Sequence, residues 1–192
     1  QVAAEGTISR TVFNSRGLPV ANWIGTDDTG ATDSDPSGGG ESGNNMVQLQ
    51  AVQYDGNAEG GNGLRTKVTS MVNASTADNR VTEMEYDWRD RLINTITTDG
   101  VDEFHQKPTL DNLGRATAMK TYRNDSSTLV LVAQSESFFD DRGRNFRNKN
   151  YAVSDSGVAG NALEANQWYD ANGRVIKSSS PGSQAFTKTV YD

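Results

Sequence analysis

Residues 169–176 read YDANGRVI, and this pattern of an aromatic residue, aspartate, two variable residues, glycine and arginine returns along the chain. Residues 86–93 read YDWRDRLI, residues 139–144 read FDDRGR, and residues 110–115 read LDNLGR. The second and fourth of these copies each depart at one position, where Asp90 replaces glycine and Leu110 replaces the aromatic residue. Such self-similarity predicts a protein built from repeated supersecondary units.

Weaker copies extend the pattern towards both ends. Residues 13–18 read FNSRGL and lack the arginine after glycine, while the copy at Tyr54-Asp55 carries an insertion before Gly63-Leu64-Arg65. Tyr191-Asp192 matches the first two positions of a further copy. We therefore interpret residues 1–192 as one repeat array, with copies that begin near 13, 54, 86, 110, 139 and 169 and a partial copy at 191.

Each copy is interpreted as a β-hairpin. The residues before Tyr86 alternate between two strand faces, and the aspartate that follows is expected to accept hydrogen bonds from the next two backbone N–H groups. The glycine tolerates the left-handed conformation that closes the loop, and Asp90 adopts it more easily than most residues. The ring and the guanidinium of one copy are expected to stack or pair across the turn. The predicted turn residues are Tyr86, Asp87, Arg91, Asp111, Gly114, Arg115, Phe139, Asp140, Gly143, Arg144, Tyr169, Asp170, Gly173 and Arg174.

Composition supports an all-β fold, an array of antiparallel hairpins that forms an extended or spiralling sheet or shell. Asn, Asp, Ser, Thr and Gly, which close turns and line solvated strand faces, make up nearly half of the chain. Residues 128–139 form the strongest predicted strand, and their apolar side chains on both faces predict a stretch covered from both sides. Residues 158–168 offer only a broken helical pattern, which we interpret as a connector at most.

Charge and residue usage exclude several classes of function. The net charge of −7 gives no electrostatic footprint for nucleic acid, and the chain has no cysteine for disulfides, thiolate metal sites or nucleophiles. The longest apolar stretch, residues 129–133, is far too short for the ~20 residues of a membrane span. Because the chain starts at Gln1, we expect a processed or excised piece.

The recurring Y-D-x-x-G-R hairpin resembles the YD-repeat (Rhs-type) family of large bacterial surface and secreted proteins. The resemblance covers residues 11–192 and implies successive hairpins that wind into a spiral wall, with no catalytic residues in the repeats. In toxin-bearing members that wall encloses a C-terminal toxin, whereas other members are adhesins or fibres. The self-cleaving motif that separates toxin from shell in that family has no match here.

Few residues are candidates for chemistry. The only histidine, His105, is interpreted as part of a polar loop between hairpins, although a general base beside two carboxylates is conceivable. The acidic low-complexity stretch of residues 26–45 is interpreted as a solvated insertion loop with little to bury. Its Asp33, Asp35 and Glu41 form a weak candidate calcium site, and no other cofactor is expected.

The leading hypothesis is a non-catalytic scaffold, secreted or on the cell surface, that forms a fibre or a shell wall. The runner-up is a surface that binds glycans or a partner, and a cocoon segment around a toxin absent from this chain is a further alternative. Trp23, Trp88 and Trp168 are possible sugar platforms but are expected to fill the sheet face or the seam between turns instead. Asn73 and Asn124 fit glycosylation sequons. The terminal strands predict either more repeats or end-to-end self-association, which we expect residues 184–192 to mediate.

Overall fold

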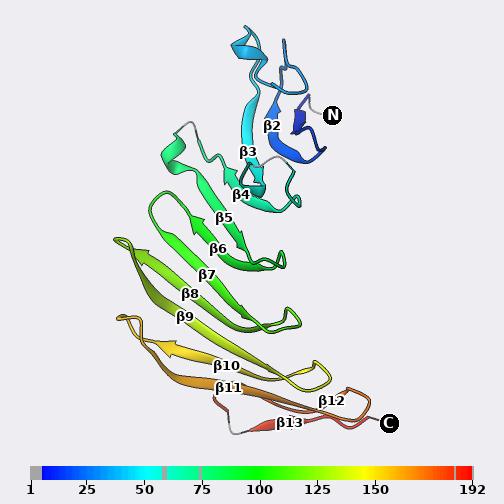
Figure 1. Ribbon diagram of the computed structural model, residues 1–192, viewed down its shortest axis with the longest axis vertical. Helices are drawn as coiled ribbons and strands as arrows, with labels where there is room; N and C mark the ends of the chain where they lie inside the picture. The colour runs from blue at the N-terminus through cyan, green and yellow to red at the C-terminus, as the bar shows by residue number, and fades with distance from the viewer. Residues whose placement is uncertain (1–5, 58–59, 74, 184, 192) are drawn as a thin grey trace. The chain divides into compact units, whose positions relative to one another are not determined.

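The computed structural model describes residues 6–57, 60–73, 75–183 and 185–191. It confirms the all-β prediction, because each strand pairs with the next in the chain and together they form one 13-stranded antiparallel sheet in the order β1 to β13 (Figure 1). The strands are β1 (Ile8–Phe13), β2 (Pro19–Gly25), β3 (Val47–Tyr54), β4 (Arg65–Ser70), β5 (Arg80–Tyr86), β6 (Leu92–Thr98), β7 (Glu103–Leu110), β8 (Ala116–Asp125), β9 (Thr128–Phe139), β10 (Asn145–Val153), β11 (Ala159–Tyr169), β12 (Val175–Ser179) and β13 (Phe186–Lys188). No helix among the described residues is long and apolar enough to cross a bilayer.

The chain divides into two compact units. The first comprises Gln1–Glu85 and Ile96–Glu103, and the second comprises Tyr86–Thr95 and Phe104–Asp192. In the first unit the apolar core is small, with Val12, Ala21 and Met46 buried. Stability in such a sheet therefore relies on backbone ladders and on side chains that link neighbouring hairpins.

The second unit contains the longest strands, and its apolar side chains stay partly exposed. The predicted strand at residues 128–139 is confirmed as β9, but the prediction that both of its faces are covered is wrong: Leu129 and Val132 remain 38% and 40% exposed. The strand packs against β8 and β10, its neighbours within the sheet. The apolar side chains on both faces of β9 thus accompany its pairing with β8 and β10, and the two faces are not covered by further layers as we expected.

The interpretation of residues 158–168 as a connector is also wrong, because the 11-residue strand β11 begins at Ala159 and ends at Tyr169. Hydrogen-bond ladders to β10 and β12 on its two edges hold this segment extended in spite of its weak pattern. The turn that precedes it had not been identified as a repeat, yet the Ser154 hydroxyl accepts the Val158 N–H at 3.1 Å and Gly157 has a φ of 80°. Ser154 thus accepts the hydrogen bond from the N–H four residues after it.

The acidic stretch connects β2 to β3 and has more internal structure than its composition indicates. Pro36 is fully buried, and the Asn44 side-chain amide donates to the carbonyls of Thr29 and Pro36 at 3.0 Å each. The side-chain oxygen Oδ1 of Asn45 accepts the backbone N–H groups of Thr26 and Asp27 at 2.8 Å each. Asparagine side chains therefore supply the hydrogen bonds that a strand ladder would otherwise provide.

Candidate functional site: the aspartate–arginine turns

One hydrogen-bond arrangement closes the repeat turns. In the copy at 139–144, one Asp140 carboxylate oxygen accepts the N–H groups of Arg142 and Arg144 at 2.9 Å, and the other accepts Nε of Arg144 at 2.7 Å. The Gly143 N–H donates to the Asp140 carbonyl at 2.8 Å. The aspartate thus caps the second and fourth residues after itself, not the next two as we predicted. The same three carboxylate bonds occur at Asp87, Asp111 and Asp170.

The left-handed position in these turns is as predicted. Gly114, Gly143 and Gly173 have φ values of 80°, 77° and 85°, and Asp90 adopts 61° at the equivalent place. An L-residue pays a steric penalty in this region, which explains the recurrence of glycine at this position.

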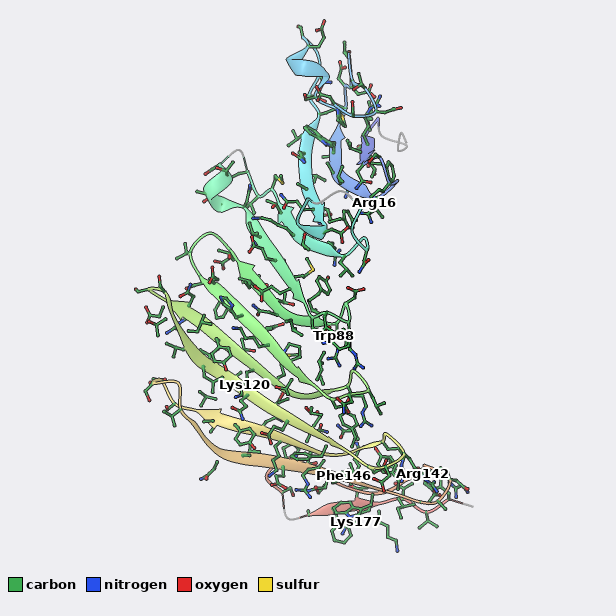
Figure 2. The ribbon with its side chains drawn as sticks, viewed as in Figure 1. Arg16, Trp88, Lys120, Arg142, Phe146 and Lys177 are labelled. Carbon is green, nitrogen blue, oxygen red and sulfur yellow. The ribbon has the colours of Figure 1, made fainter. Side chains whose placement is uncertain are left out.

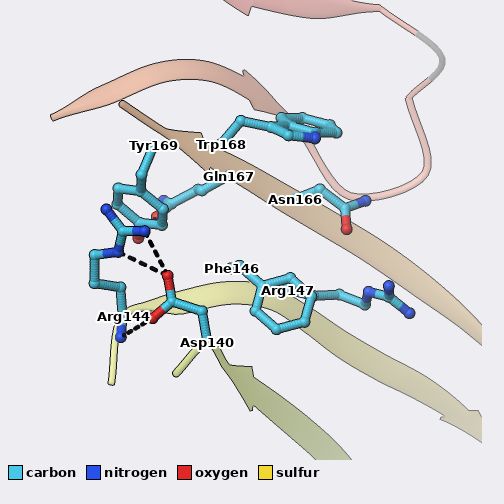
Figure 3. A pocket seen from close by; sticks show the side chains of 8 residues that line it. All are labelled: Asp140, Arg144, Phe146, Arg147, Asn166, Gln167, Trp168 and Tyr169. Carbon is cyan, nitrogen blue, oxygen red and sulfur yellow. Dashed lines mark hydrogen bonds and ion pairs between the residues drawn. The ribbon is translucent and has the colours of Figure 1, made fainter. Parts of the chain in front are cut away.

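The arginine after the glycine reaches the next copy along the chain. Guanidinium carbons lie 4.5–4.6 Å from the ring centroids in three pairs, which are Arg115 over Phe139, Arg144 over Tyr169, and Arg174 over Tyr191. The predicted pairing within one turn is therefore wrong for these rings. Each arginine is held at Nε by the aspartate of its own turn. The Nη1 end of the guanidinium therefore extends towards the neighbouring turn, as Figure 3 shows for Arg144, Asp140 and Tyr169.

Hydrogen bonds accompany the stacking. Nη1 of Arg91 donates to the Asp111 carbonyl at 2.9 Å, and Nη1 of Arg144 donates to the Asp170 carbonyl at 3.1 Å. Each of these arginines therefore bonds to its own aspartate and contacts the next copy, through a backbone carbonyl at Arg91 and Arg144 and through an aromatic ring at Arg115, Arg144 and Arg174. We call this linkage the inter-turn clamp.

A second arginine position, two residues before the first, was missed by the sequence analysis. Arg89 donates to the Asn112 carbonyl at 3.3 Å, and Arg142 donates to the Ala171 carbonyl at 2.6 Å. The signal was available, because arginine recurs at this place in the copies that begin at 13, 86 and 139.

In the first unit, the copy at 13–18 reaches the next copy from this second position. Nη1 of Arg16 forms an ion pair with the Asp55 carboxylate at 2.7 Å, and its Nη2 donates to the Gly61 carbonyl at 2.8 Å. Asn14 replaces the turn aspartate and still accepts the N–H groups of Arg16 and Leu18 at 3.0 Å. The copy that lacks arginine after glycine is therefore still linked to the next one.

These contacts lower the pKa of the turn carboxylates. Hydrogen bonds from the arginine side chains are the main cause at Asp55, Asp87, Asp140 and Asp170, whereas at Asp111 the backbone N–H of Arg115 contributes most to the lowered pKa. All five carboxylates are thus held in the charged state that the clamp requires.

The structure places the other candidate residues on strands and at a turn. His105 lies within β7 opposite Tyr122, so its assignment to a loop is wrong. Trp88 is 86% exposed at a turn, contrary to the expectation that it fills the sheet face or the seam between turns, and Trp168 is 41% exposed on β11. Trp23 is partly buried on β2.

Neither the calcium candidate nor the sequons gain a defined site. No group of three or more His, Asp or Glu side chains within the described ranges is placed to hold a metal ion, so Asp33, Asp35 and Glu41 are not brought together as one. The Asp35 carboxylate accepts hydrogen bonds from the Ser37 backbone and hydroxyl. Asn124 of one sequon lies in β8, whereas the other sequon, which begins at Asn73, includes Ala74, a residue outside the described ranges. Asp192, the second residue of the partial repeat copy, also lies outside the described residues.

A hollow of about 350 Å³ borders the clamp between β10 and β11 (Figure 3). Clamp residues Asp140, Arg144 and Tyr169 line one side. The rest of its lining consists of Phe146, Arg147, Asn166, Gln167 and Trp168.

Taken with the fold, these turns define an array of antiparallel hairpins joined by arginine clamps. No family model and no curated protein matches the chain. Among solved structures, a chain in the crystal structure of TcdB2-TccC3-Cdc42 is similar, with a TM-score of 0.61 and 15% sequence identity over 96% of this chain. The chain spans 9% of the length of that much larger chain, and the likeness shows a shared fold.

Proposed function

We propose that the chain is a non-catalytic structural segment of a secreted or cell-surface protein, in which clamped hairpins form part of a fibre or a shell wall. The clamp is the observation that carries this proposal. In the second unit each turn arginine bonds to its own aspartate and also contacts the next turn, so successive hairpins are joined at their turns as well as by strand ladders.

Two further observations support a structural role. Consecutive strands pair throughout the sheet, an arrangement in which a wall grows by adding hairpins to an edge. The likeness to a small part of a far larger chain fits a segment of a longer wall, and the resemblance of the turns to YD repeats fits a shell around a toxin. A closed shell is the finer form of the proposal, and a fibre is its alternative.

A surface that binds glycans or a partner is the second candidate function. It is favoured by Trp88, which is 86% exposed with the Arg89 guanidinium 4.9 Å from its ring centroid. Loss of binding on a glycan array by Trp88→Ala, with the melting temperature unchanged, would support this candidate over a purely structural role.

Negative-stain electron microscopy of the purified chain tests the structural proposal. We expect end-to-end filaments or elongated particles, and removal of residues 184–192 is expected to weaken any end-to-end association. Compact, non-associating particles would contradict the fibre form. Single-molecule force spectroscopy tests the mechanical role of the clamp. Arg115→Lys combined with Arg144→Lys should lower the force needed to unfold the chain, and an unchanged unfolding force would contradict a clamp that resists mechanical load.

A further inference from the structure

One face of the second unit gathers positive charge within an acidic protein. Residues directly opposite each other in antiparallel strands share a face. In the register of the sheet, Lys107 lies opposite Lys120, Arg147 opposite Phe138 and Asn166, Trp168 opposite Lys177, and Lys177 opposite Lys188. We call the face that these residues share the basic face. Its cationic side chains are Lys107, Lys120, Arg147, Lys149, Lys177 and Lys188, and Figure 2 labels Lys120 and Lys177.

Most of these cations have no acidic partner. Glu136 and Glu164 both lie opposite Lys149, and Glu164 forms an ion pair with it at 3.0 Å. Within the part of the chain that the structure describes, the other five cations form no ion pair. The net charge of −7 therefore conceals a local excess of positive charge.

Two pairs of lysines on this face lie directly opposite each other. Lys107 faces Lys120 across β7 and β8, and Lys177 faces Lys188 across β12 and β13. Like charges at directly opposed positions destabilise a sheet. An external anion that bridges the two ammonium groups would remove this cost, so the arrangement favours an anionic ligand.

Aromatic rings hold several of the cations in place. Nζ of Lys177 lies 4.3 Å from the Trp168 centroid and 4.1 Å from the Phe186 centroid, and Nζ of Lys107 lies 5.8 Å from the Tyr122 centroid. The Arg147 guanidinium lies 5.3 Å from the Phe138 centroid. The rings restrict the cations, which lowers the entropy cost of binding, and the same contacts occupy ring faces that a nucleic acid base would need.

We propose that the basic face binds a linear acidic polysaccharide, with its cations engaging carboxylates of successive sugar units. Lys107 and Lys120 lie on the adjacent strands β7 and β8, and Lys177 and Lys188 on the adjacent strands β12 and β13, so the members of each pair stand roughly 4.8 Å apart in the pairing direction. Arg147 and Lys149 lie on β10 between the two pairs, so a chain that crosses the strands from β7 to β13 meets the cations in three groups. The amides of Asn166 and Gln134 and the hydroxyl of Ser179 share the face and supply partners for sugar hydroxyl groups. Protein interfaces are depleted in lysine, so this lysine-rich face is a poor fit for a protein partner.

Affinity measurements with polygalacturonate as the probe test this proposal. Binding is expected at low ionic strength, and raising the salt should weaken it because all six cations, five half-buried and Lys188 exposed, are reached by solvent ions. Lys177→Gln should weaken binding roughly two- to fivefold, the effect of removing one surface charge contact, and Lys177→Gln combined with Lys188→Gln should weaken it further. Lys67→Gln is the matched control, because it changes the net charge equally but lies in the first unit, where Lys67 pairs with Glu83.

Three results would overturn the proposal: no binding of polygalacturonate at low salt, equal weakening by Lys67→Gln and Lys177→Gln, or tighter binding of a single-stranded thymidine oligonucleotide than of polygalacturonate. Neutral dextran should not bind. A melting curve for each variant separates loss of binding from loss of folding. Failure of this proposal leaves the structural one intact, because the clamp contains none of the substituted lysines.

Discussion

Gly173 allows the turn geometry to be tested without disturbing any packing. Its φ is 85°, and a Cβ built there would meet only the Arg144 Nη1 atom, at 3.9 Å, an ordinary contact. The cost of Gly173→Ala therefore comes from the left-handed backbone alone, roughly 1–2 kcal/mol. For a chain of this size we expect the melting temperature to fall by about 2–8 °C.

Gly160 is the matched control for this experiment. It lies in β11, its φ is not in the left-handed range, and its Cβ would meet only the Ala152 carbonyl at 3.6 Å. Gly160→Ala should leave the melting temperature unchanged or raise it slightly, because alanine restricts the unfolded chain. Thermal unfolding followed by circular dichroism measures both variants. Equal shifts for the two would refute the argument that the turn requires a left-handed residue.

Acid should weaken the clamp: the lowered pKa of the Asp170 carboxylate means that its stabilisation is present above the usual value of 3.8 and is lost as the pH falls through the lowered one. At pH values below about 4 the melting temperature of the wild-type chain should therefore decrease. The Asp170→Asn variant should show a smaller decrease over the same pH range, and identical pH profiles for the two proteins would count against the clamp. A double-mutant cycle of Arg115→Lys and Phe139→Leu should give a coupling energy of about 0.5–1 kcal/mol by chemical denaturation, whereas strict additivity would show that the stack contributes nothing. Replacing residues 26–45 by a short glycine linker should preserve the β-sheet circular dichroism, because loop closure costs only ~0.6 kcal/mol per doubling of length; loss of that signal would mean that the buried Pro36 supports the sheet.

The hairpins were predictable from sequence because their determinants are local. Aspartate, glycine and the strand alternation fix each turn within six residues. Gly143 adopts the predicted left-handed φ, and Asp140 closes the turn, although through the second and fourth N–H groups after it and not through the next two. The direction of the arginines was not predictable, since it depends on which turn lies beside which in the folded sheet.

The basic face was hidden for a different reason. Its charges are scattered through the sequence and come together only through register, while the acidic turns and the insertion loop dominate the net charge. Arg147 and Lys149 are two residues apart in one strand, and this spacing is the one local sign that cations gather on a single side.

Arg16 shows that a clamp can be made from either of two positions in a copy. Its guanidinium contacts the Asp55 carboxylate from a place two residues before the usual one, where the sequence reads SRGL instead of GR. In the copy at 86–93 both positions hold an arginine that bonds to the next turn, Arg89 and Arg91. Through such an intermediate, successive substitutions can move the linking arginine from one position to the other while the neighbouring hairpins stay linked. Copies of such an array can therefore diverge from a fixed letter pattern and still fold. A search for further hairpins of this kind should accept an arginine at either of the two positions from which its side chain reaches the next turn.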